Sequence, residues 1–323
     1  MLTGRTPQFI TRDRRMLLLL EEVRRAAASP VPVLLAGESG VGKEIVGRLI
    51  HRWSARPGPF VAVNAASLGG DLVESALFGH ARGAFTGAVR RGEGFAAAAS
   101  RGTLFLDEIG ELDGGAQSRL LRFLDDGEFI PVGETRARRS DARIVAATNR
   151  DLAAAAGRGE FRPDLYYRLA GISFLIPPLR ERPGDIAPIA DHIIRRTAAD
   201  LGLREARLSP AASRALVACR WPGNVRQLRN ELVGAIVRTG GGVIEASDLS
   251  AEVAGCAAGG AEPAAATLDE RIRNLERREI LEALRRTASN CSRAAELLGL
   301  RRTTLIYRMR RHGIVLREKG GGS

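Results

Sequence analysis

Short apolar runs alternate with amphipathic segments along residues 30–176. Apolar runs of five to eight residues are typical of buried strands in a mostly parallel sheet. They read VPVLLAG (31–37), FVAVN (60–64), GTLFLDE (102–108), ARIVAATN (142–149) and GISFLI (171–176). Between them, KEIVGRLIHRW (43–53) and QSRLLRFLDDG (117–127) repeat apolar residues every three or four positions, which predicts crossover helices. The pattern predicts an α/β fold over residues 1–176, a parallel sheet with flanking helices.

The pattern changes after residue 176. PPLRERPGD (177–185) is a proline-rich break, and residues 185–250 show helical periodicity only, so we expect a helical subdomain over 177–250. AEVAGCAAGGAEPAAAT (251–267) has the composition of a linker, and KGGGS (319–323) that of a disordered tail. Residues 268–286 predict an amphipathic helix with apolar positions Leu268, Ile272, Leu275, Ile280 and Leu284.

The formal net charge of +12 is uneven along the chain. From Thr267 to Ser323 there are 14 Lys and Arg residues against 7 Asp and Glu, which indicates a basic C-terminal module that binds nucleic acid. The alternative is a general arginine bias, because 47 of the 49 basic residues are arginine.

The composition also limits the environment of the protein. No apolar run approaches the roughly 18 residues of a membrane helix, and no signal peptide opens the chain. The cysteines, Cys219, Cys256 and Cys291, are scattered and lack metal-ligand spacing. We therefore expect a reducing cytoplasm and no disulfide framework.

GESGVGKE (37–44) follows a predicted strand and opens a predicted helix. Backbone N–H groups of such a loop cradle phosphates at the positive helix end, and a lysine reaches the terminal phosphates. Lys43 is the only lysine outside the glycine-rich tail, which indicates that this position requires an ammonium group. A plain glycine turn is the alternative, because such loops usually have Ser or Thr at position 44. The predicted ATP-binding residues are Gly37, Glu38, Ser39, Gly40, Val41, Gly42, Lys43 and Glu44.

Two carboxylates end the predicted strand LFLDE (104–108). At the carboxyl edge of a parallel sheet, Asp107 and Glu108 face the crevice where ligands bind. We expect Asp107 to hold Mg²⁺ and Glu108 to polarise a water molecule for attack on the γ-phosphate. Asn149 closes another strand at the same edge and is expected to contact phosphate or water.

GAFTGA (83–88) places Phe85 in a segment pinned by Gly83 and Gly87, which predicts a tight loop. A soluble protein gains nothing by exposing a phenylalanine. Phe85 is therefore either an apolar anchor for a partner or a side chain tucked under the loop tip. A second loop, VGETRARRSD (132–141), is expected to lie near it, with arginines that touch DNA or are merely solvated.

GESGVGKE, GAFTGA, LFLDE, ATNRDL (147–152), FRPDLYYRL (161–169) and WPGNVRQL (221–228) occur in this order. With these motifs, residues 3 to about 317 resemble the sigma-54-dependent bacterial enhancer-binding activators, which are AAA+ ATPases. GAFTGA inside an ATPase is highly specific to this family, and Glu44 is the family's usual residue. The resemblance implies an AAA+ P-loop ATPase subdomain over 1–176 and a helical lid over 177–250. Arg101, where the family commonly has glycine, is a departure.

The resemblance also assigns roles to single residues. Asn64 matches an asparagine that restrains the catalytic Glu108, and Arg226 matches the sensor arginine of the lid. Arg162 and Arg168 match arginines that reach the ATP of a neighbouring subunit. For each arginine a surface salt bridge is the alternative. Family members form rings, usually hexamers, so hydrolysis of ATP with Mg²⁺ is expected to depend on assembly.

In the family, the GAFTGA loop contacts sigma-54 in the stalled RNA polymerase; here its residues are Gly83, Ala84, Phe85, Thr86, Gly87 and Ala88. The implied function is an activator that binds enhancer DNA and uses ATP hydrolysis to convert the closed promoter complex into the open one. The rivals are a regulator that uses ATP only to assemble or acts on another polymerase form, and a protein-unfolding chaperone. Because the ATPase unit starts near residue 1, we expect control by a separate protein or a fragment of a longer chain.

NCSRAAELLGLRRTTLIYRMRRHGI (290–314) has a helix-turn-helix layout. Ala295, Gly299 and Leu305 fall where a small residue, a turn glycine and a core aliphatic are needed. We expect residues 268–318 to form a DNA-binding domain similar to the family's Fis-type module, and a dimer of it would read a near-palindrome. A basic surface helix is the alternative. The expected DNA-binding residues are Arg302, Thr303, Thr304, Tyr307, Arg308 and Arg311.

Overall fold

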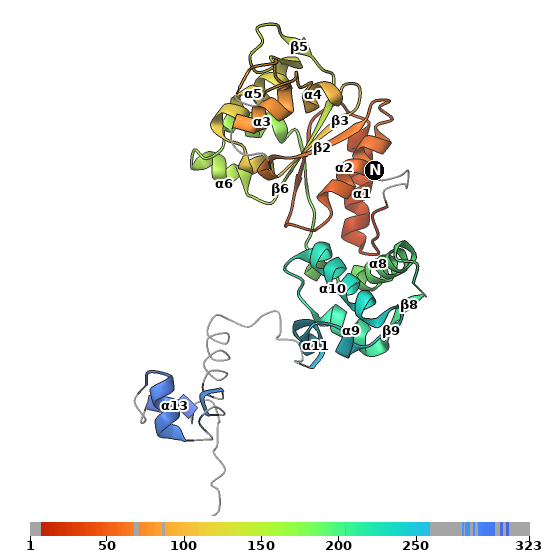
Figure 1. The fold of residues 1–323 in the computed structure, drawn as a ribbon, viewed down its shortest axis with the longest axis vertical. Coiled ribbons are helices and arrows are strands. Elements are labelled where there is room, and N and C mark those ends of the chain that lie inside the picture. Colours follow the sequence, from red (N-terminus) through yellow and green to blue (C-terminus); the bar gives the residue numbers. More distant parts are fainter. Residues whose placement is uncertain are drawn as a thin grey trace, which may run out of the picture. The chain divides into compact units, whose positions relative to one another are not determined.

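The computed structural model describes residues 8–67, 71–85, 88–203 and 205–258, followed by 280, 282–284, 287, 290–300, 304–305 and 308–309. The chain divides into two compact units, Met1–Ala258 and Gly259–Ser323. The larger unit contains an α/β core and a helical lid (Figure 1). Within the described ranges, no helix is long and apolar enough to cross a membrane.

A five-stranded parallel sheet lies at the centre of the core, in the order β2-β3-β6-β1-β7. Because β6 lies between β1 and β3, the loops that follow these three strands meet at one edge of the sheet. Each of the five predicted strands is present: β1 (Val33–Ala36), β2 (Phe60–Asn64), β3 (Thr103–Asp107), β6 (Arg143–Thr148) and β7 (Ile172–Leu175).

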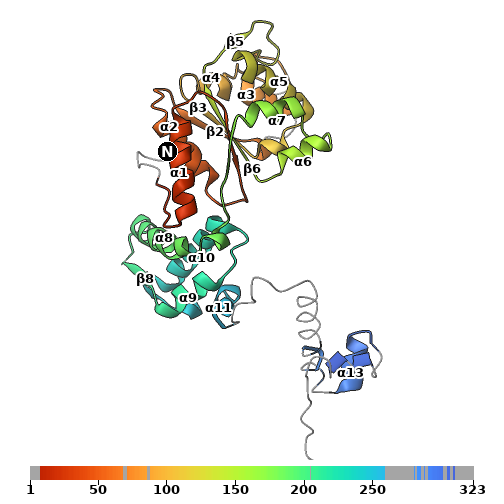
Figure 2. The same ribbon diagram turned by 180° about the vertical axis from the view of Figure 1, so that it is seen from behind.

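Helices cover both faces of the sheet (Figures 1 and 2). Successive residues of a strand point to opposite faces of the sheet. Leu35 packs in the apolar cluster under α1 (Arg14–Ala27) and α2 (Lys43–Trp53), and Leu34 packs in the apolar cluster on the opposite face. Burial on both sides explains the continuous apolar runs and confirms the predicted fold class. The opposite face carries α3 (Asp71–Phe78), α5 (Gly114–Asp126), α6 (Leu152–Gly157) and α7 (Pro163–Leu169).

Helix α5 and several short elements complete the core. α5 begins three residues before its predicted start, because the Asp113 side chain accepts a hydrogen bond from the Ala116 N–H and caps the helix. The short elements are the turns η1 (Ala65–Ser67) and η2 (Ile109–Glu111), helix α4 (Phe95–Ala98) and the antiparallel pair β4 (Glu128–Phe129) and β5 (Arg138–Arg139).

The lid begins with two 3₁₀ turns and is mostly helical. A parallel pair of three-residue strands, β8 (Ala206–Leu208) and β9 (Gly242–Ile244), corrects the expectation of helices only; segments this short carry no readable periodicity. Its other elements are η3 (Leu179–Glu181), η4 (Pro183–Asp185), α8 (Ile186–Asp200), α9 (Pro210–Ala218), α10 (Asn224–Thr239), η5 (Ala246–Asp248) and α11 (Ala251–Ala258).

Helix α11 occupies the first eight residues of the predicted linker. Its composition is rich in alanine, which favours helix as well as low complexity, and Val253 is buried in the lid core. Cys256 of α11 and Cys219, at the end of α9, form a disulfide with Cα atoms 5.5 Å apart. The expectation of no disulfide was therefore wrong. The two cysteines are 37 positions apart in sequence, and only the packing of α11 on α9 brings them together.

The smaller unit contains α13 (Cys291–Leu297) and a compact apolar core. Ala295 and Leu305 are buried in this core, and Gly299 has a φ of 62°, in the left-handed region that favours glycine. These are the three positions on which the helix-turn-helix prediction rests, and its spacing is confirmed. Of the predicted helix 268–286, only 280 and 282–284 are described; the remainder and the predicted tail 319–323 lie outside the described residues.

Candidate functional site

The glycine-rich loop 37–42 joins β1 to α2. Gly40 and Gly42 have φ of 79° and 106°, and a Cβ atom on Gly40 would lie 2.5 Å from the Gly223 carbonyl oxygen of the lid. Only glycine fits these positions. Gly42 is the N-cap of α2 and supplies no side-chain hydrogen bond, so the first N–H groups of the helix remain available to phosphate oxygens.

Lys43 lies inside this loop and is 8% exposed. Its Nζ donates hydrogen bonds to the carbonyl oxygens of Gly37, at 2.7 Å, and Glu38, at 3.0 Å. Burial lowers the pKa of Lys43, while the negative charges of Asp107 and Glu108 act in the opposite direction. The ammonium group is thus hydrogen-bonded to the loop carbonyls and lies within the electrostatic influence of the two carboxylates.

Asp107 and Glu108 end β3 at the edge of the sheet where the loop lies. Burial raises the pKa of Asp107, and the nearby Lys43 opposes this shift. Glu108 has a φ of 54°, which is uncommon for a residue with a side chain and is typical of strained functional positions. A half-buried carboxylate beside a lysine provides the hard oxygen ligand that Mg²⁺ takes together with nucleotide phosphates.

The two asparagines also lie at this edge. Asn64 pairs with Asp107 in the β2–β3 register, and its Oδ1 accepts a hydrogen bond from the Ala66 N–H at 2.9 Å. Among the described contacts, none joins Asn64 to Glu108, so the restraining role of Asn64 stays a prediction. Asn149 follows β6 and is exposed, next to the strand ends that carry the loop and the carboxylates.

The lid contacts the phosphate loop through polar side chains. Arg226 donates from Nη1 to Ser39 Oγ at 2.8 Å, which places the predicted sensor arginine at the loop. Asn224 donates to Glu38 Oε2 and to the Ser39 carbonyl, each at 3.0 Å, and Arg180 donates two hydrogen bonds to the Glu38 carboxylate. The bonds from Arg180 and Asn224 lower the pKa of Glu38. Neither a sequence pattern nor a local charge excess indicates these roles for Arg180 and Asn224.

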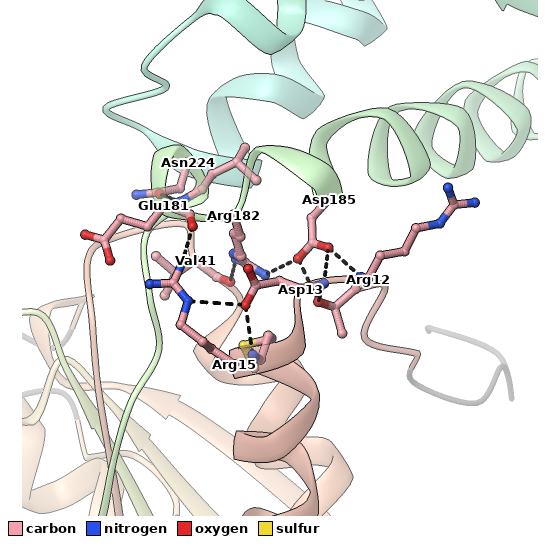
Figure 3. A network of polar contacts seen from close by, with 11 residues as sticks. Arg12, Asp13, Arg15, Val41, Glu181, Arg182, Asp185 and Asn224 are labelled. Atoms are coloured by element: carbon pink, nitrogen blue, oxygen red, sulfur yellow. Dashed lines mark hydrogen bonds and ion pairs between the residues drawn. The ribbon is translucent and has the colours of Figure 1, made fainter. Parts of the chain in front are cut away.

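A second contact between lid, loop and N-terminal segment is buried (Figure 3). Arg182 donates from Nη2 to the Val41 carbonyl oxygen at 2.8 Å and pairs with Asp185 at 3.6 Å; both charged residues are 0% exposed. The Asp185 carboxylate also accepts hydrogen bonds from groups before α1: Thr11 Oγ1, Arg12 N and Asp13 N. The proline-rich stretch 177–185, predicted to be a break, therefore contains a buried ion pair whose arginine connects the lid to the phosphate loop by a hydrogen bond.

Arg162 and Arg168 lie at the start and near the end of α7. Arg162 donates two hydrogen bonds to Asp164, at 3.0 and 2.7 Å, and Arg168 lies 3.0 Å from Asp125. All four side chains are about half exposed, and such pairs contribute only about 0–1 kcal/mol. Ion pairs this weak leave both guanidinium groups able to turn toward another partner.

The GAFTGA loop is described at Gly83, Ala84, Phe85 and Ala88; Thr86 and Gly87 lie outside the described residues. The Gly83 N–H donates to the Ala88 carbonyl at 2.8 Å, which closes the loop at its base. Phe85 is 37% exposed, so it is neither free in solvent nor tucked into the core. The second loop does lie beside the first, because the Ala81 N–H donates to the Val132 carbonyl at 2.8 Å.

Of the predicted DNA-contacting residues, Thr304 and Arg308 are described, and both have helical backbone. Arg302, Thr303, Tyr307 and Arg311 lie outside the described residues, so contact with bases or phosphates stays a prediction for all six.

Three protein families match the chain in succession. Residues 9–174 match the sigma-54 interaction domain, residues 180–266 the AAA+ ATPase lid domain, and residues 271–312 the bacterial regulatory proteins of the Fis family. The lid match reaches past residue 250, in agreement with the position of α11.

Individual proteins give the same result. Regulatory protein AtoC of Escherichia coli strain K12 is 40% identical over 311 residues, which cover 94% of this chain and 68% of AtoC. NtrX from Brucella abortus, crystallised with ADP, superposes with a TM-score of 0.72 at 30% identity, over 96% of this chain and 70% of NtrX. Its complex with ATP gives a TM-score of 0.71 at 31% identity over the same shares of the two chains. The chain belongs to the family of sigma-54-dependent bacterial transcriptional activators, with an AAA+ domain, its lid and a Fis-type helix-turn-helix.

Proposed function

We propose that the protein hydrolyses ATP between neighbouring subunits of a ring and uses this reaction to remodel sigma-54 RNA polymerase from the closed to the open promoter complex. The Fis-type module binds enhancer DNA and brings the ring to the promoter. The complexes of NtrX with ADP and ATP support nucleotide binding at the corresponding loop of this chain.

The side chains at the sheet edge suit hydrolysis of the terminal phosphate. Lys43 and the N–H groups at the start of α2 hold the phosphate oxygens. Glu108 accepts a proton from water as the water oxygen attacks the γ-phosphorus and the bond from that phosphorus to the ADP oxygen breaks. Mg²⁺, held by Asp107, would neutralise charge on the same phosphate oxygens. Arg226 lies against Ser39 of the loop, where it can follow the loss of a phosphate.

Dependence on a ring follows from the exposed arginines of α7. The carboxylate partners of Arg162 and Arg168 on their own subunit are exposed, and a neighbour's ATP is a stronger anionic partner. An arginine supplied in this way is worth about 10³- to 10⁵-fold in rate in other phosphoryl-transfer enzymes. Hydrolysis is therefore confined to assembled protein.

The placement of the GAFTGA loop is the observation on which the proposal chiefly rests. The loop lies between β2, which ends at Asn64, and β3, which ends at Asp107, and these two residues are neighbours in the sheet. The segment that carries Phe85 thus enters β3 at Thr103, on the opposite edge of the sheet, and leaves β2 at Asn64, at the edge where ATP is bound. A change at that edge on hydrolysis shifts the base of the loop and moves Phe85 against sigma-54.

A promoter-opening assay tests this proposal. Purified protein, sigma-54 holoenzyme and enhancer-promoter DNA are mixed with ATP or with a non-hydrolysable ATP analogue, and promoter melting is measured. We expect open complexes with ATP only, and none when the holoenzyme carries a different sigma factor. Equal opening with the analogue would support the rival function, in which ATP serves assembly alone.

A further inference from the structure

His80 lies at the base of the GAFTGA loop, where three segments meet. Its N–H donates to the Gly92 carbonyl at 3.0 Å, and the Gly92 N–H donates back at 3.0 Å, so the outgoing and returning arms of the loop pair at this residue. A parallel bridge joins His80 to Val132 of the second loop. The backbone around the imidazole is therefore fixed by two neighbouring segments.

Hydrogen bonds hold the imidazole ring at both nitrogens. Nε2 lies 3.1 Å from the carbonyl oxygen of Arg90, and Nδ1 lies 2.8 Å from Ser75 Oγ. A carbonyl oxygen can only accept, so Nε2 carries the proton, and in the neutral ring Nδ1 accepts from the Ser75 hydroxyl. Ser75 belongs to α3 and is buried. The ring thus links a core helix to the returning arm of the loop.

The same ring packs against Phe85. The two ring centroids are 5.0 Å apart with an interplanar angle of 63°, an edge-to-face arrangement. Backbone hydrogen bonds close the loop around Phe85, but Gly83 contributes no side-chain packing: its φ is 79°, and a Cβ atom there would have no neighbour within 4 Å. The His80 ring is therefore a side-chain surface against which the partly exposed Phe85 ring rests.

We propose that His80 is a positioning residue that holds Phe85 in the orientation in which it contacts sigma-54. This inference rests on the proposed function of the loop. None of the His80 contacts described above involves a residue of the nucleotide site, so His80 acts on the partner contact and leaves ATP chemistry to other groups.

The surroundings of the Phe85 ring can be probed without sigma-54. The protein is labelled with 4-fluorophenylalanine at its 10 phenylalanines, and the Phe85 signal is the fluorine resonance absent from Phe85→Leu. We expect His80→Ala to shift this resonance. His51→Ala is the matched control, because His51 also contacts a hydroxyl, Thr103 Oγ1, and a phenylalanine ring, Phe60, but between α2 and the sheet. His51→Ala should leave the Phe85 signal unmoved.

A second variant displaces the ring without removing it. A Cβ atom on Gly92 would lie 2.5 Å from His80 Cε1 and 2.7 Å from Nδ1, so Gly92→Ala forces the imidazole away. It should shift the Phe85 resonance as His80→Ala does. This variant keeps the test decisive if His80→Ala fails to fold. An unshifted resonance in the variants that fold overturns the proposal.

Trapping of the protein on sigma-54 with an ATP transition-state mimic measures how the loss of His80 affects the contact with sigma-54. We expect His80→Ala to trap sigma-54 about 2- to 12-fold more weakly, the factor that an aromatic pair of about 0.5–1.5 kcal/mol provides, with ATP turnover near that of the wild type. Unchanged trapping in His80→Ala, while Phe85→Ala loses it, overturns the positioning role alone. Unchanged trapping in Phe85→Ala overturns the proposed function of the loop itself.

Discussion

Replacing Asp185 with alanine tests the buried connection between lid, phosphate loop and N-terminal segment. The substitution removes three accepted hydrogen bonds and leaves Arg182 as a buried charge without its carboxylate partner. Burial already lowers the pKa of Arg182, and Asp185 is the main group that opposes this. Breaking a buried ion pair from one side costs about 3–5 kcal/mol. For a unit of this size the melting temperature should fall by about 6–20 °C.

Differential scanning calorimetry measures this change, and ATP titration measures its effect on the loop held by Arg182. Asp200→Ala is the matched control: Asp200 pairs with Arg196 at 3.9 Å on the exposed side of α8, and its loss should cost less than about 0.5 kcal/mol. The double variant Arg182→Met, Asp185→Ala should be more stable than Asp185→Ala, because no buried charge is left unpaired. Equal melting temperatures for Asp185→Ala and Asp200→Ala would refute the reasoning.

Three further predictions concern ATP and DNA. Lys43→Ala should lose ATP binding, whereas Glu108→Gln should bind ATP without hydrolysing it. Filter binding measures the first property and phosphate release the second. Normal turnover in Glu108→Gln would exclude Glu108 as the base. ATP turnover per subunit should rise steeply with protein concentration. Mixing Arg168→Ala subunits with Lys43→Ala subunits should restore part of the ATP turnover. Turnover that stays constant on dilution to a demonstrated monomer contradicts the ring mechanism. Removal of residues 268–323 should abolish the specific DNA footprint and leave ATP hydrolysis intact. Arg308→Ala should reduce the slope of log binding constant against log salt concentration by about one.

The sequence predicted the core because burial leaves a strong pattern there. Strands covered on both faces are continuous apolar runs, and Lys43 is conspicuous in a chain that otherwise uses arginine. The helix-turn-helix was equally readable, because Ala295, Gly299 and Leu305 are each required by packing or backbone conformation.

Features made by tertiary packing left no such pattern. Arg182 and Asp185 are charged residues in a proline-rich stretch, where solvent exposure is the usual outcome, yet they are fully buried. Cys219 and Cys256 meet only because α11 packs on α9, and the alanine-rich composition of α11 suits a linker as well as a helix. The contact between His80 and Phe85 depends on the register of two loop arms, which neither residue type reveals.

The central claim is that Phe85 carries the contact with sigma-54 and takes no part in ATP chemistry. The most direct measurement is the affinity of the ring for sigma-54, trapped with an ATP transition-state mimic, together with ATP turnover for the same Phe85→Ala sample. Truncating an aromatic anchor costs about 2 kcal/mol or more, so we expect a loss of roughly 30-fold or more in trapping at unchanged turnover. Val237→Ala, which truncates a 63% exposed apolar side chain on the lid, should change neither quantity. Wild-type trapping and promoter opening by Phe85→Ala would contradict the account.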